Sequence, residues 1–323
     1  MKSWVHSLTA GSHTLALHEV PEPEPDADEI LVRVKAASFN RGEIAAASKA
    51  PAAAEGKPAG IECAGEIVRT GSAAGDFKPG EKVLGRARMA FSEYAVLHKG
   101  DAVRVPAGLS WEEAAGASIT YQVAYEILFG EGTLSAGEWL LITGVTSGVG
   151  VAALQLGKLI GAQVIGTSRS PEKLATLAER GLDYGLVYEE NEFVKQVREI
   201  TGEHGVDVIV NNVGGGVFAN CLKVLAFQGR LATVGNMDGI GHATIDLTAQ
   251  HNKRLKLFGV SNKLRSPEDR SRSVALFASD ILPAMNERKI VPVIDRVFAF
   301  VEAQQGLDYM NANNQVGKII VKL

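Results

Sequence analysis

The sequence predicts an α/β protein with a compact, barrel-like N-terminal domain followed by a doubly wound parallel sheet. Two patterns predict it. Between Ile30 and Val105, short apolar runs are separated by Gly, Ser and Pro turns, as in a small barrel of antiparallel strands. Between Trp139 and Val260, apolar runs alternate with helical segments, as in a parallel sheet whose strands are joined by helices. The chain has 323 residues, a length that favours two domains.

The N-terminal strands follow a stiff segment. Pro21–Asp26 alternates proline with acidic residues and is expected to be an extended connector. From Ile30 to Ala36 the side chains alternate with the period of two that a half-buried strand requires. The Ala-rich stretch Ala45–Ala59 is expected to be a loop or a short helix. Further strands are expected at Gly60–Val68, Lys82–Leu84, Ser92–Leu97 and Asp101–Val105.

The second part begins at Ser110, where Ser-Trp-Glu-Glu has the N-cap and the acidic first turn of a helix. A second helix is expected over Tyr121–Phe129. The strands of the sheet are expected at Trp139–Thr143, Val164–Ser168, Gly185–Tyr188, Val206–Val210, Gly229–Val234 and Leu255–Val260. Helices between them are expected at Pro171–Arg180 and Asn191–Thr201. After Ser266 we expect an amphipathic helix, a strand at Val293–Phe300, another helix and a last strand at Lys318–Leu323.

Composition narrows the range of functions. The chain is 46% hydrophobic and 22% charged, and its net charge of −4 gives no electrostatic reason to expect nucleic acid or membrane partners. The N-terminus leads into no apolar signal region and no run of 18 apolar residues occurs, so neither a signal peptide nor a membrane-spanning helix is expected. Cys63 and Cys221 stand alone, which suits a reducing cytoplasm and excludes a disulfide framework.

Three glycines, Gly144, Gly148 and Gly150, lie where the first strand of the predicted sheet turns into a helix. Such a turn brings the backbone close to a pyrophosphate and presents free N–H groups at a helix N-terminus. A tight turn without a ligand is the plainer alternative. The position of the glycines between two apolar strands favours a dinucleotide site.

The end of the second strand indicates which dinucleotide binds. A site that prefers NAD places Asp or Glu about 20 residues after the glycines, where the carboxylate binds the ribose 2′-hydroxyl. This chain has Ser168 and Arg169 there, with Lys173 one helical turn later. These groups suit a 2′-phosphate, which a carboxylate would repel. The alternative is that Arg169 and Lys173 are simply charged side chains in contact with water. Positive charges at the start of a helix, however, are unfavourable with the helix dipole unless an anion lies nearby. We therefore expect NADP(H).

Further motifs extend along the whole chain, at Ser38–Asn40, Gly60–Gly65, Phe77–Val83, Ser92–Ala95, Gly144–Gly150, Gly205–Val208, Val213–Gly215, Gly229–Leu231 and Gly317–Ile319. In this order and spacing they resemble the medium-chain dehydrogenase/reductase superfamily, and within it the zinc-free quinone oxidoreductase (zeta-crystallin-like) branch. The resemblance implies a GroES-like β-barrel catalytic domain built from residues 1–118 and 262–323, with a Rossmann domain, residues 119–261, inserted. It also implies NADPH in the cleft between the domains and a homodimer. Leu255–Val260 is a candidate edge strand for pairing across that dimer.

The resemblance assigns cofactor contacts residue by residue. The phosphate turn falls on Ser147, Gly148 and Val149, and the 2′-phosphate contacts fall on Ser168, Lys173 and Tyr188, with Arg169 adding to them. The nicotinamide side falls on Asn40, Val234, Gly235, Asn236, Phe258 and Val260. Lys318 is expected to reach back to the cofactor from near the C-terminus. Two of these residues have plainer alternatives, Tyr188 as an aromatic at a strand edge and Asn40 as a turn residue that caps its own backbone.

Three positions depart from the pattern that the resemblance implies. Val123 stands where relatives often have a Thr whose hydroxyl meets the nicotinamide amide. Glu43 stands where relatives have Asp, and Ala45–Ala54 lacks the aromatic residue that relatives often place over the substrate. These departures do not weaken the expectation of a cofactor, but they leave the identity of the substrate undetermined.

The resemblance also indicates whether the site is expected to bind a zinc ion. Zinc-dependent relatives use a Cys near the place of Asn40, a His beside Glu62 and four closely spaced cysteines, whereas here Ile61 precedes Glu62 and no cysteine cluster occurs. Zn²⁺ needs three or four convergent ligands, which Glu62 and Cys63 do not supply. We therefore expect a zinc-free site, with Cys63 as a small buried hydrophobic residue.

The expected activity is hydride transfer from NADPH to a quinone or to an alkene activated by a carbonyl group. Asn40 is the candidate catalytic residue, as a polar group near the reacting end. Two alternatives are a reductase of a substituted acrylate or enoyl thioester, and an NADPH-binding structural or RNA-binding protein with little turnover. A serine hydrolase is disfavoured, because Thr146-Ser147-Gly148 lacks the Gly-x-Ser-x-Gly spacing. The sequence names neither the physiological substrate nor the proton donor.

Overall fold

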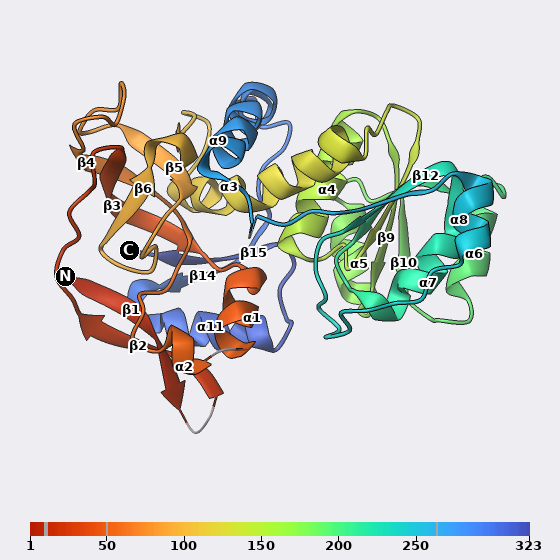
Figure 1. Cartoon of the computed structure of the whole chain (residues 1–323), viewed down its shortest axis with the longest axis horizontal. Coiled ribbons are helices and arrows are strands. Elements are labelled where there is room, and N and C mark those ends of the chain that lie inside the picture. Colours follow the sequence, from red (N-terminus) through yellow and green to blue (C-terminus); the bar gives the residue numbers. More distant parts are fainter. Residues whose placement is uncertain (10–11, 50, 263) are drawn as a thin grey trace. The chain divides into compact units, whose positions relative to one another are not determined.

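The structure, a computed structural model, describes residues 1–9, 12–49, 51–262 and 264–323. The chain folds into two units (Figure 1). The first unit is built from both ends of the chain, Met1–Thr120 and Ser266–Leu323, and the second from the middle, Tyr121–Arg265. The first is rich in β-strands and the second is a parallel sheet with helices, so the α/β class predicted from the sequence is confirmed.

The first unit contains a seven-stranded sheet in the order β14-β15-β3-β4-β5-β7, with β6 paired to β3. Its strands are β3 (Glu29–Ser38), β4 (Glu62–Thr70), β5 (Lys82–Arg86), β6 (Tyr94–His98), β7 (Ala102–Arg104), β14 (Ile294–Ala299) and β15 (Lys318–Lys322). Strand β3 is central because side chains on both of its faces are buried. β15 pairs with β3 in antiparallel fashion, with Ile320 opposite Ser38, which brings the two ends of the chain into one core.

The helices of the first unit include two short N-terminal helices and a C-terminal group. They are α1 (Arg41–Lys49), α2 (Pro51–Ala54), the 3-10 turn η1 (Lys99–Asp101), α9 (Pro267–Leu276), the π-helix η3 (Phe277–Ile281), α10 (Leu282–Asn286), the 3-10 turn η4 (Phe300–Glu302) and α11 (Ala303–Asn311). The Ala-rich stretch predicted as a loop or short helix thus contains the end of α1 and all of α2.

One long helix replaces the two predicted between residues 110 and 129. α3 (Trp111–Tyr125) continues directly as the π-helix η2 (Glu126–Glu131), so the prediction of a separate second helix is wrong. No proline interrupts this stretch. Its first glycine, Gly116, packs closely, because an added Cβ would lie 3.4 Å from side-chain atoms of Lys318 and Pro292.

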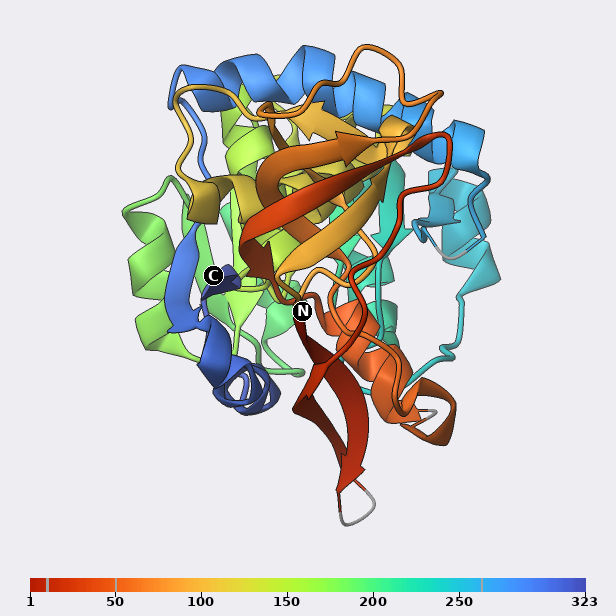
Figure 2. The same ribbon diagram turned by 90° about the vertical axis from the view of Figure 1, so that its left-hand side faces the viewer.

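An N-terminal hairpin was not expected from the sequence. β1 (Lys2–Thr9) and β2 (Ser12–Glu19) pair along their length, with Lys2 opposite Glu19 (Figure 2). Trp4 anchors the hairpin, because its ring is buried and its indole N–H donates to Phe300 O at 2.7 Å. His, Ser and Thr interrupt the apolar alternation of both strands, so the period of two is too weak to reveal them.

The second unit is a six-stranded parallel sheet in the order β10-β9-β8-β11-β12-β13, the doubly wound arrangement that the sequence predicts. Its strands are β8 (Trp139–Thr143), β9 (Gln163–Ser168), β10 (Tyr184–Val187), β11 (Val206–Asn211), β12 (Leu225–Thr233) and β13 (Lys256–Gly259). Its helices are α4 (Gly148–Leu159), α5 (Pro171–Ala178), α6 (Phe193–Ile200), α7 (Gly215–Val224) and α8 (Leu247–Lys253). The strand order reverses between β8 and β11, and ligands of such sheets bind beyond the carboxyl ends of the strands at this point.

Two histidines in the hairpin make its stability depend on pH. His6 Nδ1 lies 2.8 Å from His13 Nε2, and burial together with the neighbouring His13 lowers the pKa of His6 from 6.5 to about 4. The unfolded chain therefore takes up a proton near pH 6.5 while folded His6 stays neutral. The contribution of His6 to stability is present above that pH and is lost as the pH falls toward 4. We expect a loss of about 2 kcal/mol in the free energy of unfolding.

His6→Phe tests this dependence, because phenylalanine keeps a ring at the buried position and does not titrate. Chemical denaturation of both proteins at about pH 7 and about pH 4.5 gives the change in the free energy of unfolding. The variant is expected to lose less stability than the wild type over this interval. An equal loss in both proteins would contradict the assignment to His6.

Candidate active site

The glycine turn of the second unit joins β8 to α4. Gly144 follows β8, has a φ of +62° and donates its N–H to Thr167 Oγ1 at 3.3 Å. Ser147 caps α4, since its Oγ accepts the N–H of Gly150 at 3.0 Å. A Cβ on Gly150 would lie 2.6 Å from the carbonyl oxygen of Val145. The turn therefore requires glycine at this position.

The first amides of α4 fit an anionic group. The helix has 12 residues, and the N–H groups of Gly148 and Val149 in its first turn have no acceptor within the helix. Together with the helix dipole they form the set of donors that phosphates take at helix N-termini. The turn thus places side by side the three residues predicted to hold the pyrophosphate, Ser147, Gly148 and Val149.

The end of β9 carries the groups predicted for a 2′-phosphate. Ser168 is the last residue of β9, and its Oγ accepts the N–H of Ser170 at 3.2 Å. Ser170 caps α5 by accepting the N–H of Lys173 at 3.2 Å, and it donates its hydroxyl to Glu172 at 2.7 Å. Arg169 is exposed, and within the described part of the chain no hydrogen bond or ion pair holds its guanidinium. A hydroxyl and two cations therefore gather where α5 begins.

Tyr188 lies beside Ser168. β10 runs parallel to β9 with Val187 opposite Ser168, and the N–H of Tyr188 donates to Ser168 O at 3.1 Å. The Tyr188 ring packs against Phe193 with centroids 5.2 Å apart, and its hydroxyl accepts from Asn220 Nδ2 at 3.3 Å. Burial raises the pKa of Tyr188. The hydroxyl therefore keeps its proton and has it available for an anion.

The residues predicted for the nicotinamide side, apart from Asn40, lie in or just after the last two strands of the sheet. Val234 donates its N–H to the last residue of β11, and Val260 donates to the last residue of β12, each at 3.0 Å. Gly235 and Asn236 continue from Val234, and Asn236 is exposed. Phe258 lies in β13 and is half-buried. The structure thus brings these five residues to the carboxyl end of the sheet.

A second glycine-rich turn, Val213–Gly216, leads into α7, which begins at Gly215, but other groups of the chain accept the amides of Gly215 and Gly216. Asp238 Oδ2 accepts the N–H of Gly216 at 2.8 Å, and Ile240 O accepts that of Gly215 at 3.0 Å. The sequence does not reveal this cap, because Asp238 lies 22 residues beyond Gly216. The start of α4 is therefore the better candidate for binding a ligand.

In the first unit, Asn40 belongs to a buried polar group that we call the Glu62 cluster, made of Ser38, Asn40, Glu62 and Lys318. Glu62 Oε2 accepts from Ser38 Oγ at 2.5 Å and from Asn40 Nδ2 at 3.1 Å. The same oxygen pairs with Lys318 Nζ at 3.1 Å, and Glu62 Oε1 accepts the N–H of Ile119 at 2.6 Å. Glu62 is 0% exposed and Lys318 is 4% exposed.

Strand register assembles the Glu62 cluster. Ser38 ends β3 and lies opposite Ile320, the third residue of β15, which begins at Lys318. Glu62 begins β4, the neighbour of β3 on its other side. Sequence reasoning missed the cluster, because Glu62 and Lys318 are 256 residues apart and only the pairing of the strands brings them together.

The ammonium of Lys318 binds groups of the protein, whereas the resemblance implies that it contacts the cofactor. Its ammonium has three N–H donors, and they reach Phe39 O at 3.2 Å, Asn40 Oδ1 at 3.0 Å and Glu62 Oε2 at 3.1 Å. All three donors are used inside the first unit. In this arrangement Lys318 holds Asn40 and Glu62 in place and has no donor left for a cofactor.

Glu43, on α1, is a second buried carboxyl group of the first unit. Its Oε1 accepts the N–H of Gly60 at 2.9 Å. Its Oε2 is buried and has no hydrogen-bond partner among the residues that the structure describes. Burial raises the pKa of Glu43 to about 7, and Glu62 adds to the rise, while the Gly60 N–H, Lys318 and Arg86 oppose it. This carboxyl group therefore changes its protonation near neutral pH.

Neither a metal site nor a membrane span is found among the described residues. Within residues 1–9, 12–49, 51–262 and 264–323, no three His, Cys, Asp or Glu side chains are grouped so that they could hold a metal ion. Cys63 is buried, as predicted, and so is Cys221; burial raises the pKa of both thiols. In the same ranges no helix has the length and apolar character needed to span a bilayer.

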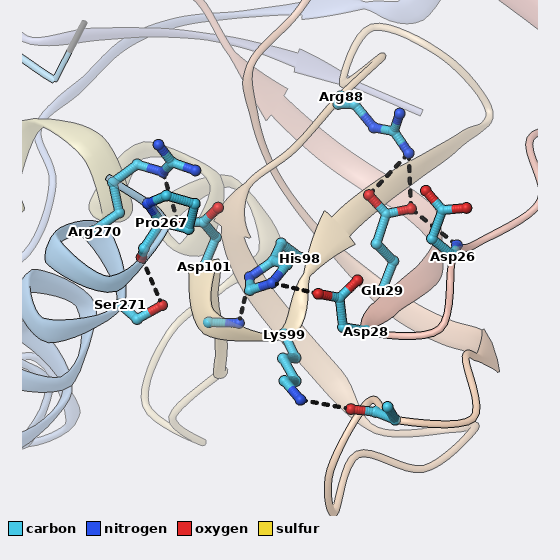
Figure 3. A network of polar contacts seen from close by, with 12 residues as sticks. Asp26, Asp28, Glu29, Arg88, His98, Lys99, Asp101, Pro267, Arg270 and Ser271 are labelled. Carbon is cyan, nitrogen blue, oxygen red and sulfur yellow. Dashed lines mark hydrogen bonds and ion pairs between the residues drawn. The ribbon is translucent and has the colours of Figure 1, made fainter. Parts of the chain in front are cut away.

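A second polar cluster of the first unit surrounds His98 (Figure 3). His98 Nδ1 accepts the N–H of Gly100 at 3.0 Å, so the ring proton lies on Nε2 and is donated to Asp28 at 3.0 Å. Asp101 of η1 pairs with Arg270 of α9 at 3.7 Å. Because these contacts link α9 to the ends of β3 and β6, we interpret this cluster as part of the scaffold; it includes none of the predicted site residues.

Family models match both parts of the chain. A model of the alcohol dehydrogenase GroES-like domain matches residues 26–107, and a model of a zinc-binding dehydrogenase matches residues 148–279. A solved mycobacterial protein in complex with NADPH has a TM-score of 0.87 at 23% identity, with 100% of both chains covered. These matches and the strand order confirm the fold that the resemblance implied, a GroES-like domain with an inserted Rossmann sheet.

Curated relatives differ in what they do. A phenolphthiocerol/phthiocerol polyketide synthase protein of Mycobacterium tuberculosis is 27% identical over 312 residues, 96% of this chain and 14% of that protein. The acryloyl-coenzyme A reductase of Sulfurisphaera tokodaii is 28% identical over 336 residues, 95% of this chain and 96% of that protein. The quinone oxidoreductase-like protein 2 homolog of Nematostella vectensis is 35% identical over 183 residues, 56% of this chain and 50% of that protein. The chain thus spans only a small part of the synthase protein and half of the Nematostella protein.

Gly150→Ala tests the glycine turn. The added Cβ would lie 2.6 Å from Val145 O and 2.7 Å from Gly144 O, so the turn has to open. We expect the free energy of unfolding to fall by about 1–3 kcal/mol and NADPH affinity to fall at least about tenfold. The control is Gly130→Ala, since the nearest atom there, Glu126 Cγ, is 3.6 Å away. Unchanged NADPH affinity of Gly150→Ala in a fluorescence titration would contradict the assigned role of the turn.

Glu43→Gln tests the buried carboxyl group. The pKa of Glu43 is about 7 in the folded chain against 4.5 as its ordinary value, so between these values the folded state holds a proton that the unfolded state has released. The contribution to stability is complete below the lower value and is lost as the pH rises through the higher one. We expect the wild type to lose about 3 kcal/mol more than the variant between about pH 4.5 and pH 8. Parallel stability curves in denaturant titrations would show that Glu43 titrates normally.

Proposed function

Because the chain belongs to the medium-chain dehydrogenase/reductase superfamily, we propose that it is an NADPH-dependent, zinc-independent reductase that transfers a hydride to a quinone or to an alkene activated by a carbonyl group. The observation that carries the proposal is the end of β9. There Ser168 stands in place of a carboxylate that would bind a ribose 2′-hydroxyl, and Arg169 and Lys173 lie close by.

Each part of the cofactor would meet groups that suit its charge. The first amides of α4 suit the pyrophosphate. Arg169 and Lys173 suit the 2′-phosphate, and the hydroxyl of Tyr188 keeps a proton for the same group. Val234, just after β12, and Phe258, in β13, are half-buried apolar residues that suit the nicotinamide ring. When bound, NADPH supplies the hydride, and the chain supplies binding and orientation.

The bonding of Glu62 supports zinc independence. Its two oxygens together accept four hydrogen bonds, from Ser38, Asn40, Ile119 and Lys318. These donors occupy the lone pairs that a metal would need. A metal ion would also separate the buried ammonium of Lys318 from its counter-charge, which is strongly unfavourable. The preceding residue, Ile61, has no side-chain atom that binds metal.

Asn40 is the catalytic candidate of this proposal. It lies between β3 and α1, is half-buried, and is held by Glu62 and Lys318. A side chain fixed in this way orients the reacting groups, and orientation of donor and acceptor lowers the barrier without chemistry by the protein itself. The similarity to a quinone oxidoreductase-like protein supports a quinone as hydride acceptor.

A reductase of an enoyl thioester or substituted acrylate is the second candidate. It is favoured by the acryloyl-coenzyme A reductase, which matches over nearly the whole of both chains. An acryloyl thioester is also an alkene activated by a carbonyl group, so the same site suits it. An NADPH-binding structural or RNA-binding protein has less support, because a net charge of −4 gives no general attraction to nucleic acid.

The proposal includes a homodimer that works in the cytoplasm. β13 is one of the two edge strands of the parallel sheet, so two copies of β13 can pair and continue the sheet across a two-fold axis. Cys63 and Cys221 are free thiols, which suits a reducing compartment. Light scattering of the purified protein measures the oligomeric state.

The activity test is oxidation of NADPH and of NADH by purified, EDTA-treated protein with a quinone, an α,β-unsaturated ketone and an acryloyl thioester. We expect turnover with NADPH that the chelator does not change, and the preferred acceptor distinguishes the first candidate from the second. Tight NADPH binding without turnover of any acceptor would favour the binding protein. Loss of activity with EDTA would contradict zinc independence.

Arg169→Asp tests the choice of cofactor. A carboxylate at this place repels the 2′-phosphate and binds a ribose hydroxyl instead. We expect the dissociation constant for NADPH to rise about 10- to 100-fold, with little change or a gain in affinity for NADH. Arg254→Asp, at another exposed arginine of the same unit, is the control and should leave both constants unchanged. An unchanged preference for NADPH in Arg169→Asp would remove Arg169 from the site.

A further inference from the structure

We propose that Glu62 and Lys318 lock the side-chain amide of Asn40 in one orientation, so that Asn40 meets a ligand as a hydrogen-bond acceptor and not as a donor. Glu62 and Lys318 are positioning residues in this proposal, since they contact Asn40 and not the ligand. The inference rests on the proposed function, which places Asn40 at the reacting end.

Opposite charges on the two sides of the amide set its orientation. Lys318 Nζ lies 3.0 Å from Asn40 Oδ1, and Glu62 Oε2 lies 3.1 Å from Asn40 Nδ2. Turning the amide by half a rotation would set its oxygen against the carboxylate and its NH₂ group against the ammonium. Two charge-assisted hydrogen bonds would then become two repulsive contacts. The charges therefore decide which end of the amide faces which neighbour.

Burial keeps the two charges where they are. Glu62 is 0% exposed and Lys318 is 4% exposed, and their charged atoms are 3.1 Å apart. Moving either group would leave the other as an uncompensated buried charge. Ser38 Oγ and the N–H of Ile119 hold the carboxylate from further sides. Asn40 is thus held in a frame to which β3, β4 and β15 all contribute.

The hydrogen bonds that Asn40 already makes determine which of its side-chain groups can bind a ligand. A side-chain amide has two N–H donors and two acceptor sites on its oxygen. The nitrogen donates to Glu62 Oε2 at 3.1 Å and to Ser38 O at 3.4 Å. The oxygen accepts from Lys318 alone among the described residues. The site that stays open is the second acceptor position on the oxygen.

The proposed reaction contains one group that matches an open acceptor. The oxygens of a quinone or an enone are themselves acceptors, so they gain nothing from Asn40 Oδ1. The carboxamide of the nicotinamide ring carries an NH₂ group, which donates. Asn40 in this arrangement would therefore orient the ring of the cofactor through that carboxamide and would not donate to an oxygen of the substrate.

The acceptor role is tested with a reduced cofactor analogue in which an acetyl group replaces the carboxamide, so that the N–H donors are missing. Fluorescence titration gives the dissociation constants of NADPH and of the analogue. The wild type is expected to bind NADPH about tenfold more tightly than the analogue, and Asn40→Ala is expected to bind both about equally. A preference in Asn40→Ala equal to that of the wild type would overturn the acceptor role.

The lock is tested with Glu62→Leu/Lys318→Met, which removes both buried charges together, a change that folded proteins often tolerate. We expect the preference for NADPH over the analogue to fall to about two- to threefold, and the addition of Asn40→Ala to remove this remaining preference. If this variant does not fold, Glu62→Gln is used instead. Glutamine has only one side-chain oxygen, so it does not accept hydrogen bonds from all the donors that reach the two carboxylate oxygens of Glu62. A wild-type preference in the folded variant would overturn the lock.

Two controls separate the lock from a general loss of cofactor binding. Arg288→Gln breaks another ion pair of the same unit, Arg288–Glu113, and is expected to keep the wild-type preference. A wild type that does not bind NADPH would refute the proposed function itself. A wild type that binds NADPH tightly but binds the analogue equally well would refute only this inference.

Discussion

The buried ion pair between Glu62 and Lys318 joins two strands of the first unit and holds Asn40. Removing two charges from water costs several kcal/mol for each, and only close pairing with further hydrogen bonds offsets that cost. Here the carboxylate and the ammonium pair at 3.1 Å. Because one charge comes from β4 and the other from β15, neither is compensated until the C-terminal strand has joined β3. The ion pair therefore couples the closure of the sheet to the placement of Asn40.

The second unit shows how similar turns acquire different roles. Both α4 and α7 begin at glycine-rich segments at the carboxyl edge of a parallel sheet, and the first-turn amides of both helices have no acceptor within the helix itself. At α7 the carboxylate of Asp238 accepts one of these amides. At α4 the cap is the neutral hydroxyl of Ser147, and no carboxylate among the described residues accepts an amide of the first turn. This difference between the two helices supports the start of α4 as the place where a phosphate binds.

The parts of the structure that the sequence predicted are those set by local pattern. The six parallel strands follow from apolar runs between helical segments, and Ser147, Gly148 and Val149 share a turn because they are consecutive. The hairpin of β1 and β2 was missed, because polar residues break its alternation. The continuity of α3 was also missed, since no local signal separates one helix from two. The contacts of Lys318 depend on strand pairing across 256 residues, which no local pattern contains.

Two carboxyl groups near Asn40 have different surroundings and so serve different purposes. Glu62 has donors on both oxygens and pairs with the ammonium of Lys318, so it is held in place and directs a neighbouring amide. Glu43 has one satisfied oxygen and one buried oxygen without a partner in the described part of the chain, and burial raises its pKa to about 7. A group fully held by donors suits orientation, whereas a group poised between two protonation states suits proton exchange. The first unit thus keeps orientation, through Glu62, separate from the residue whose charge changes at neutral pH.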